Sequence, residues 1–350
     1  MMAKSKEILW NIVIVFSIAA TFMGTVVGAG FASGQEILQF FCRYGLSGVF
    51  GIALSVVIIS IITAKIFKIG KILRSDSYKD FLGWLLPKRL VLLADLFLVV
   101  FFVLLIGVMF AGSGAIFKEL HLGYWNGIII TAVVLIIVLN KDLPGLMVMN
   151  LLVIPLMFTS SLLVACFAIS RGTVTAVSLP SPANWAMAAA QFSSYNIILA
   201  VPVLLSLAKR FRKEALLTAG GWFGGIFLGI MTGFIYWAII VHYDRLQQSE
   251  IPMLILARRI GAISYWGYAF ILWGEMLTTL IANTYGLAKR FAASTGYQFQ
   301  YWVIGLSIVG ILVAELGFTT LIAKIYPIYG CLSMVLLVLV LIKRIPKSFP

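Results

Sequence analysis

One stretch of the first long apolar segment, residues 24–36, has the composition of a binding site. It reads GTVVGAGFASGQE and holds four glycines, two hydroxyl side chains, an amide and a carboxylate. Glycine lowers helix propensity by about 1 kcal/mol relative to alanine, so this density of glycines predicts a broken helix. Unwound backbone at membrane depth is tolerated only where it faces protein or a water-filled cavity, and its free carbonyls can coordinate a cation. The alternative interpretation is a packing seam, because small residues let helices approach closely.

A second polar run lies in the sixth apolar segment, where residues 191–196 read QFSSYN and Pro202 follows. Proline removes a backbone N–H, so this run predicts a second helix break. Serine hydroxyls often bond back to their own helix, and the pair alone would mean little. Two interrupted segments in corresponding positions of two five-segment halves are typical of transporters that bind substrate between the breaks. We therefore expect substrate contacts from Gly28, Ala29, Gly30, Phe31, Ser33, Gly34, Phe192, Ser193, Ser194, Tyr195 and Asn196.

The eighth apolar segment contains a carboxylate, Glu275, well over two helical turns from either end. Thr278, Thr279 and Asn283 follow it at helical spacing. A charged side chain inside a membrane is costly and is typically part of an ion or proton pathway. We expect Glu275 to bind a proton or a cation. The alternative is a neutral acid that is hydrogen-bonded within the helix bundle.

Other ionisable residues are weaker candidates. Asp95 lies about two turns inside its segment, and we expect it to pair with Lys88 or Arg89. Glu36 lies toward the outer end of the first segment, and it ranks with Asp95 as the next candidate for coupling after Glu275. The histidines fall in connections between segments, which argues against a histidine proton relay through the membrane.

The sequence carries no enzyme signature: no phosphate-binding loop, nucleophile elbow, dinucleotide fingerprint or metal-ligand spacing. Cys42, Cys166 and Cys331 are far apart, and we expect them to be small buried hydrophobes. We therefore expect no catalytic residue, no cofactor and no transition metal. Sodium or a proton is the candidate coupling ion.

The chain that must position these residues is strongly apolar. Of its 350 residues 62% are hydrophobic and 11% charged, with a mean hydropathy of +1.08. Soluble domains are about 45–50% apolar and ~25% charged, so a soluble enzyme is excluded. The apolar runs are continuous, which excludes a membrane β-barrel and predicts helices that satisfy their own backbone hydrogen bonds. Ten such spans are expected, over residues 8–43, 46–66, 90–117, 124–139, 143–169, 185–207, 215–241, 262–288, 301–316 and 321–342.

The lysines and arginines predict the orientation of these spans, because cytoplasmic loops are enriched in them. With a cytoplasmic N-terminus, 19 of the 26 basic residues lie on the cytoplasmic side and 7 on the outer side. This split predicts a multi-pass protein of the cell (cytoplasmic) membrane with both termini in the cytoplasm. It also explains the net charge of +14 without a nucleic-acid partner.

Two connections are longer than simple turns. Residues 65–89, on the inner side, hold seven basic residues with aromatic and aliphatic side chains between them. They predict an amphipathic helix beside anionic lipid headgroups. Residues 243–261, on the outer side, include an apolar run at 251–256 that is too short to span a membrane. That run predicts a re-entrant segment or a cap over an external opening.

Residues 21–36, TFMGTVVGAGFASGQE, resemble the first-helix motif of the bacterial YkvI-like membrane proteins, a group placed in the amino acid–polyamine–organocation superfamily. The resemblance extends over the whole chain in length and helix number. It implies an all-α integral membrane protein with the LeuT-type fold. Such a fold has ten transmembrane helices in a 5+5 inverted repeat, here residues 1–170 and 184–343, with helices 1 and 6 broken around a central substrate. The implied function is secondary active transport of an amino acid or a similar small polar organic molecule.

The resemblance also implies a place for a coupling ion. Sodium-coupled members of this fold hold one sodium between backbone carbonyls of helix 1 and hydroxyls of helix 8. In this chain these are the carbonyls of Gly24 and Val27 and the hydroxyls of Thr278 and Thr279. Glu275 departs from the pattern, because relatives carry a small residue there. An acid at this position can strengthen a cation site or replace sodium with a proton.

Two other coupling devices of the superfamily are absent by the same alignment. The asparagine that serves a second sodium falls on Phe31, and residues 143–169 lack the helix-five lysine of proton-coupled relatives.

The leading hypothesis is therefore an ion- or proton-coupled symporter that works by alternating access, with a small-molecule substrate and the lipid bilayer as its partners. The alternative is a non-transporting sensor or receptor subunit on the same fold, as in spore germinant receptors. A sensor usually needs partner subunits or a soluble signalling region, and the absence of a soluble domain favours transport. A channel would need a continuous polar pore, whereas two midspan breaks suit an occluded site better.

Overall fold

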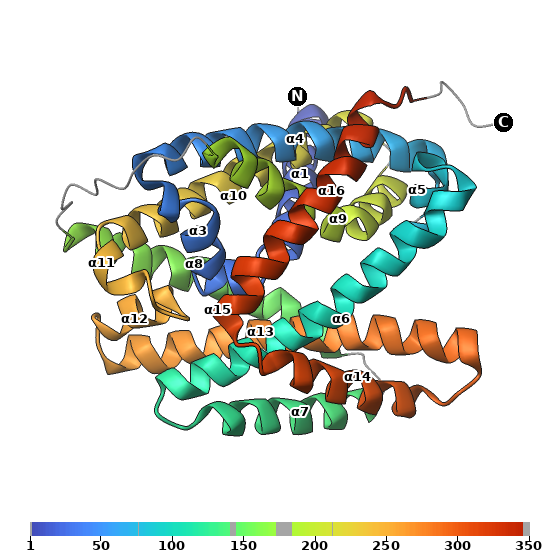
Figure 1. Ribbon diagram of the computed structural model, residues 1–350. Coiled ribbons are helices and arrows are strands. Elements are labelled where there is room, and N and C mark those ends of the chain that lie inside the picture. The colour runs from blue at the N-terminus through green and yellow to red at the C-terminus, as the bar shows by residue number, and fades with distance from the viewer. Residues whose placement is uncertain (1, 76, 141–144, 173–183, 212, 346–350) are drawn as a thin grey trace.

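The computed structural model describes residues 2–75, 77–140, 145–172, 184–211 and 213–345, and every regular element in these ranges is a helix (Figure 1). The all-helical architecture expected of a membrane protein is confirmed. Three shorter apolar helices cover Tyr124–Asn140, Pro155–Ser170 and Phe299–Ala314, and the total of ten membrane spans stays a prediction. Within the described ranges, six helices are long and apolar enough to cross a membrane: Glu7–Val26, Cys42–Leu73, Lys88–Glu119, Trp185–Arg210, Glu214–Ile240 and Phe318–Ile342.

The first segment is broken where the glycines predict it. Helix α1 (Met2–Val26) is followed by two residues outside any helix, Val27 and Gly28, and α2 (Ala29–Ala32) adds a single turn. A second interruption follows at Gly34, whose φ of 82° is in the left-handed region that favours glycine. The chain then continues through α3 (Gln35–Phe40) and the 3-10 helix η1 (Cys42–Ser47). The prediction of a non-helical stretch within residues 24–34 is confirmed.

The rest of the first half contains α4 (Gly48–Leu73), α5 (Tyr78–Leu85), α6 (Lys88–Glu119), α7 (Tyr124–Asn140) and α8 (Gly145–Ser170). Helix α5 lies in the inner connection and is capped by Ser77, whose hydroxyl accepts a hydrogen bond from the Asp80 amide. It buries Phe81, Leu82 and Leu85 against the bundle. The short amphipathic helix expected there is present, and its contact with lipid headgroups stays a prediction.

The predicted break in the sixth segment is wrong, because α9 (Trp185–Arg210) is one continuous helix with Pro202 inside it. Its polar side chains bond back to their own helix. The hydroxyls of Ser193 and Ser194 donate to the carbonyls of Ala189 and Ala190, at 2.8 and 2.6 Å. The polar run therefore continues the helix instead of ending it.

Pro202 is accommodated by a contact from another helix. A proline leaves the carbonyl four residues earlier, here that of Ile198, without its helical N–H partner. The hydroxyl of Tyr78, on α5, donates to this carbonyl at 3.4 Å.

The second half continues through α10 (Glu214–Ile240), the short helices α11 (Tyr243–Leu246) and α12 (Pro252–Arg258), and the 34-residue α13 (Ala262–Thr295). Helix α14 (Phe299–Ala314) and the turn α15 (Phe318–Thr320) follow, and then the π-helical turn η2 (Leu321–Ile325) and α16 (Tyr326–Ile342). Residues 252–256 of the apolar run lie in α12, a short buried helix, and the role of the run as a re-entrant segment or a cap over an external opening stays a prediction.

The long helices pack in two groups of four. Helices α1, α4, α9 and α10 pack against one another, and α6, α7, α13 and α14 form the second group. Helix α8 packs against α10 and α13, and α16 packs along α9. In Figure 1 helices α7, α13 and α14 occupy the lower part of the molecule, α6 descends to them from beside α5, and α16 crosses the upper part diagonally. Each group thus takes two successive long helices from each half of the chain. Two repeats of common topology would produce this order, and the boundaries 1–170 and 184–343 stay a prediction.

Candidate binding cavity at the helix-one break

A cavity of about 140 Å³ lies at the break between α1 and α2. At roughly 10–15 Å³ for each water-sized probe, this space holds about ten waters or one small organic molecule. Besides the first segment, four helices line it: α6, α9, α13 and α16. The lining residues are Gly24, Thr25, Val26, Val27, Gly28, Gly30, Glu36, Phe102, Leu105, Met109, Tyr195, Asn196, Leu199, Glu275, Thr279, Asn283 and Tyr326.

Glu36, in the first turn of α3, is one of two carboxylates in this lining. Its side chain is only 4% exposed. The Tyr195 hydroxyl, from α9, donates a short hydrogen bond to Oε2 of Glu36. The carboxylate lies against Gly30. If residue 30 had a side chain, its Cβ would lie 2.2 Å from Oε1 of Glu36. Glycine at position 30 therefore makes room for the acid, and Tyr195 orients it.

The turn between α2 and α3 is held by local and distant hydrogen bonds. The Ser33 hydroxyl donates to the Gly30 carbonyl at 2.9 Å and accepts from the Gln35 amide at 3.2 Å. The Ser33 carbonyl accepts the Met253 amide, in the first turn of α12, at 3.0 Å. The Tyr268 hydroxyl, from α13, donates to the Ala32 carbonyl at 2.7 Å. Helix α12 therefore covers the turn between α2 and α3, on the side of the bundle that the charge split predicts to be outside.

Glu275, on α13, is the second carboxylate of the cavity and is also 4% exposed. Its Oε2 is buried and has no hydrogen-bond partner among the described residues. An unpaired buried acid oxygen is costly, so this atom marks a place where a donor or a cation belongs. Two buried acids thus lie on one cavity, one oriented by a tyrosine and one without a partner.

The predicted coupling residues are largely brought together. Gly24, Val27, Glu275 and Thr279 all line the cavity, whereas Thr278 does not. The Thr278 hydroxyl donates to the Glu275 carbonyl at 3.1 Å and is 1% exposed. The break also frees backbone acceptors. The amide of Gly28 bonds to Val26 and not to Gly24, and no donor to the Gly24 or Val27 carbonyl is present in the described residues.

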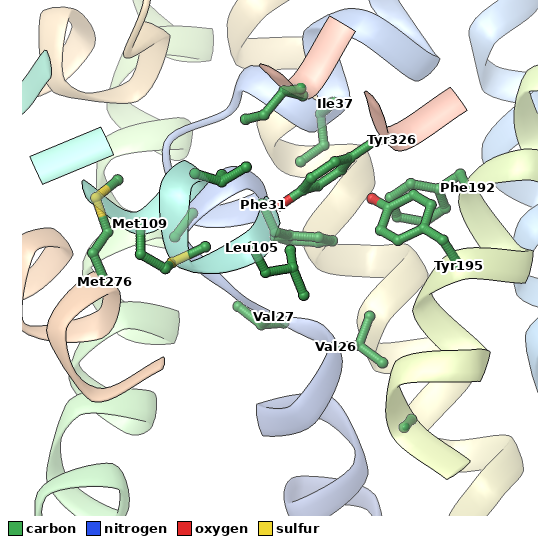
Figure 2. Close-up of a cluster of buried hydrophobic side chains, with 14 of the residues drawn as sticks. Val26, Val27, Phe31, Ile37, Leu105, Met109, Phe192, Tyr195, Met276 and Tyr326 are labelled. Carbon is green, nitrogen blue, oxygen red and sulfur yellow. The ribbon is translucent and has the colours of Figure 1, made fainter. Parts of the chain in front are cut away.

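Only some of the predicted substrate residues line the cavity. Gly28, Gly30, Tyr195 and Asn196 line the cavity. Phe31 and Phe192 instead pack with their rings 6.5 Å apart in the aromatic cluster of Figure 2.

The remaining predicted substrate residues support the helices. Ser193 and Ser194 bond to their own helix, as described above, and Ser33 and Gly34 form the turn before α3. The side chain of Ala29 lies outside the described part of the structure.

From the sequence, Glu36 ranked below Glu275, Asn283 was noted at helical spacing but given no role, and Tyr326 was missed; all three line the cavity. Tyr326 begins α16, and its ring lies 5.0 Å from that of Tyr195 (Figure 2). Asn283 follows Glu275 at a spacing of eight residues on α13, which places both on one helix face. That spacing is a signal which the sequence did contain. Tyr326 had no comparable signal, because its contact with α9 is purely tertiary.

Asp95 lies away from the cavity and does not pair with Lys88 or Arg89 as predicted. It forms an ion pair with Arg290 of α13. The two helices, α6 and α13, pack directly against each other, so a tertiary partner replaces the sequence neighbours. Within the described residues no group of three or more His, Cys, Asp or Glu side chains is arranged to hold a metal ion.

Two known proteins of similar sequence are named as uncharacterized, and one of them is named as a membrane protein. The chain is 29% identical over 335 residues to the uncharacterized membrane protein YkvI of Bacillus subtilis (strain 168), covering 94% of this chain and 96% of that protein. It is 28% identical over 324 residues to the uncharacterized protein YyaD of the same organism, covering 91% and 94%. No protein-family profile matches the chain.

Solved structures identify the fold. The chain superimposes on Mhp1, a nucleobase-cation-symport-1 family transporter, in a closed conformation with bromovinylhydantoin bound, with a TM-score of 0.65 and 16% identity. That match covers 92% of this chain and 77% of Mhp1. The inward-facing conformation of Mhp1 matches with a TM-score of 0.66 and 14% identity, covering 91% and 73%. The protein is therefore an all-helical membrane protein with the Mhp1 fold. The sequence similarity to YkvI agrees with the resemblance of the first-helix motif.

Proposed function

We propose that the protein is a secondary active transporter that moves an amino acid or a similar small polar organic molecule by alternating access. The observation that carries this proposal is the cavity at the helix-one break, with two buried carboxylates in the centre of a membrane bundle. Buried ionisable groups are expensive in a membrane protein and typically mark a substrate or ion pathway. The Mhp1 fold supports the proposal, because transporters of this architecture bind substrate at such breaks.

The exposure of the cavity residues supports an inward-facing state. Gly24, Leu199 and Asn283 lie toward the end of the bundle where α1 begins and remain partly exposed. Glu36 follows the turn that α12 contacts through the Ser33 carbonyl, and both Glu36 and Tyr326 are buried. With the N-terminus in the cytoplasm of the cell, as the 19-to-7 split predicts, the site is closed to the outside and accessible from the inside. Alternating access would then require α12 to move away from the turn before α3 and to break the hydrogen bond between the Met253 amide and the Ser33 carbonyl.

The coupling ion of the proposed symport, Na⁺ or H⁺, would use Glu275. Glu275 shares the cavity with the helix-one carbonyls of Gly24 and Val27, which have no donor in the described structure. A carboxylate beside free carbonyls is a set of hard oxygen ligands suited to an alkali cation, and a carboxylate alone can carry a proton.

Uptake by reconstituted protein tests the proposal. Purified protein in liposomes is given radiolabelled small polar solutes under an imposed sodium gradient, an imposed proton gradient, or neither. Accumulation above the equilibrium level under one gradient is expected. Equilibration without accumulation under every gradient, for a solute that demonstrably binds, would contradict coupled transport. Matched empty liposomes control for leakage.

A further inference from the structure

We propose that the cavity binds the ammonium group of a small organic amine that carries no carboxylate, and that Glu36 is its anchor. This narrows the substrate class of the proposed transporter and rests on that function for its physiological meaning. The binding itself is measurable without transport.

The charged side chains that line the cavity are all acidic. Glu36 and Glu275 both line it, and its lining contains no lysine, arginine or histidine. None of the lysines and arginines in the described part of the chain lines this cavity. A ligand carboxylate would therefore meet two acids and no counter-charge, whereas an ammonium group would meet two carboxylates. Such interactions are stronger in a buried site than in water, so this asymmetry selects for positive charge.

An unsatisfied atom points independently to a missing donor. Oε2 of Glu275 is buried, lines the same cavity, and accepts no hydrogen bond from the described residues. An ammonium group brings three N–H donors and a positive charge, and it would supply the donor that the protein lacks.

Glu36 is the better placed of the two acids to act as the anchor. Tyr195 donates to one of its oxygens and holds the carboxylate in one orientation, while Gly30 leaves the space that the acid occupies. A carboxylate accepts several hydrogen bonds, so sites remain for a ligand. The rings of Tyr195 and Tyr326 lie 5.0 Å apart (Figure 2), and both residues line the cavity together with Glu36. Aromatic faces attract cations and favour the carbon chain of an amine at the same time.

The test measures thermal stabilisation of the purified full-length protein by matched four-carbon ligands: n-butylamine, butan-1-ol, butyrate and 4-aminobutyrate. A ligand that binds the folded state raises the melting temperature by mass action. Only n-butylamine is expected to stabilise at millimolar concentration. Equal or greater stabilisation by butan-1-ol, butyrate or 4-aminobutyrate would overturn the inference.

Substitutions test whether Glu36 anchors the amine. Glu36→Gln keeps the size of the side chain and removes its charge, so the affinity for n-butylamine is expected to fall about tenfold or more. The matched control is Glu315→Gln, an exposed acid outside the cavity, which should bind the amine as the parent does. Undiminished amine binding by Glu36→Gln would overturn the role of Glu36.

If Glu36→Gln does not fold, Tyr195→Phe carries the test. This change removes only the hydroxyl that orients the acid, and a fall of about three- to tenfold in amine affinity is expected. Affinity equal to that of the parent would overturn the inference.

Uptake separates this inference from the proposed function. Amine binding without any uptake would contradict transport and leave the inference standing. Coupled uptake of a zwitterion that survives Glu36→Gln would overturn the inference and leave transport standing.

Discussion

Gly30 lies directly against the carboxylate of Glu36: a Cβ on residue 30 would sit 2.2 Å from Oε1 and 2.9 Å from Cδ of the acid. Gly30 and Glu36 belong to one short sequence motif, on either side of a turn. They pack so closely that a side chain at position 30 would overlap the acid. The glycine-rich composition of the motif serves this contact as well as the break in the helix.

Gly30→Ala is expected to displace the Glu36 carboxylate and break its hydrogen bond with Tyr195. Ligand binding or uptake should fall by about tenfold or more, while the free energy of unfolding falls by only about 1–2 kcal/mol, because a flexible side chain can move aside. Gly286→Ala is the matched control. This glycine lies on α13, and a Cβ added there would meet no neighbouring side chain or helix within 4 Å. Parent-like binding in Gly30→Ala would show that the position of Glu36 is unimportant.

Glu275→Gln is expected to uncouple transport. The change keeps the size and hydrogen-bonding capacity of the side chain and removes its charge and its proton. The variant should fold and exchange substrate, yet lose accumulation against a gradient. A cation held by this carboxylate should also bind more weakly as pH falls, because a proton competes for the same oxygens. Concentrative uptake equal to that of the parent, with unchanged ion dependence, would leave Glu275 as a packing acid and direct the search to Glu36, the other carboxylate of the cavity.

Tyr78 and Pro202 are expected to be energetically coupled. Tyr78→Phe removes the donor to the Ile198 carbonyl and should lower the free energy of unfolding by about 0.5–1.5 kcal/mol. In a Pro202→Ala background the backbone N–H of residue 202 can donate to that carbonyl, so the same change should cost less. A double-mutant cycle in denaturant measures the difference. Additive effects of the two changes would show that the hydroxyl does not compensate for the proline. Tyr297→Phe, at an exposed tyrosine, controls for loss of a hydroxyl.

His242, in the connection after α10, is expected to make stability depend on pH. Its Nε2 lies 3.2 Å from the Ala168 carbonyl and its Nδ1 lies 3.1 Å from Nη1 of Arg259. A neutral ring that carries its proton on Nε2 satisfies both contacts. Burial, followed by the positive charges of Arg259 and Arg245, lowers the pKa of His242 below its usual value of 6.5. The unfolded chain therefore binds this proton more readily than the folded protein does.

The stabilising contribution of His242 is thus complete at pH values above 6.5 and is lost as the pH falls below it. Melting temperatures of the parent and of His242→Gln, measured at pH 8 and pH 5, test this. The parent should lose more stability than the variant on acidification. Identical losses would mean that protonation of His242 is not linked to folding.

The 19-to-7 charge split predicts the orientation of the chain. On a background without Cys42, Cys166 and Cys331, a cysteine at Gln248 should react with an impermeant reagent in intact cells, and a cysteine at Ser348 should react only after lysis. Labelling of position 348 from outside would reverse the topology and the side from which the cavity is reached.

The sequence determined those features that depend on neighbouring residues. Four glycines in eleven residues are enough to interrupt α1, since helix propensity is local, and long apolar runs are enough to predict a helical membrane protein. Glu275 stood out because a carboxylate in the middle of an apolar segment is costly wherever the segment lies.

Only the tertiary structure decided the features that depend on residues far apart in the chain. Helix α9 stays continuous because its serines bond to their own carbonyls and because Tyr78, from another helix, donates to the carbonyl left free by Pro202. Glu36 joins the cavity because the left-handed turn at Gly34 redirects α3 toward α9, where Tyr195 meets it. Tyr326 joins because α16 packs along α9. A pattern of residue types carries no information on which distant side chains meet, since the packing of whole helices sets those contacts.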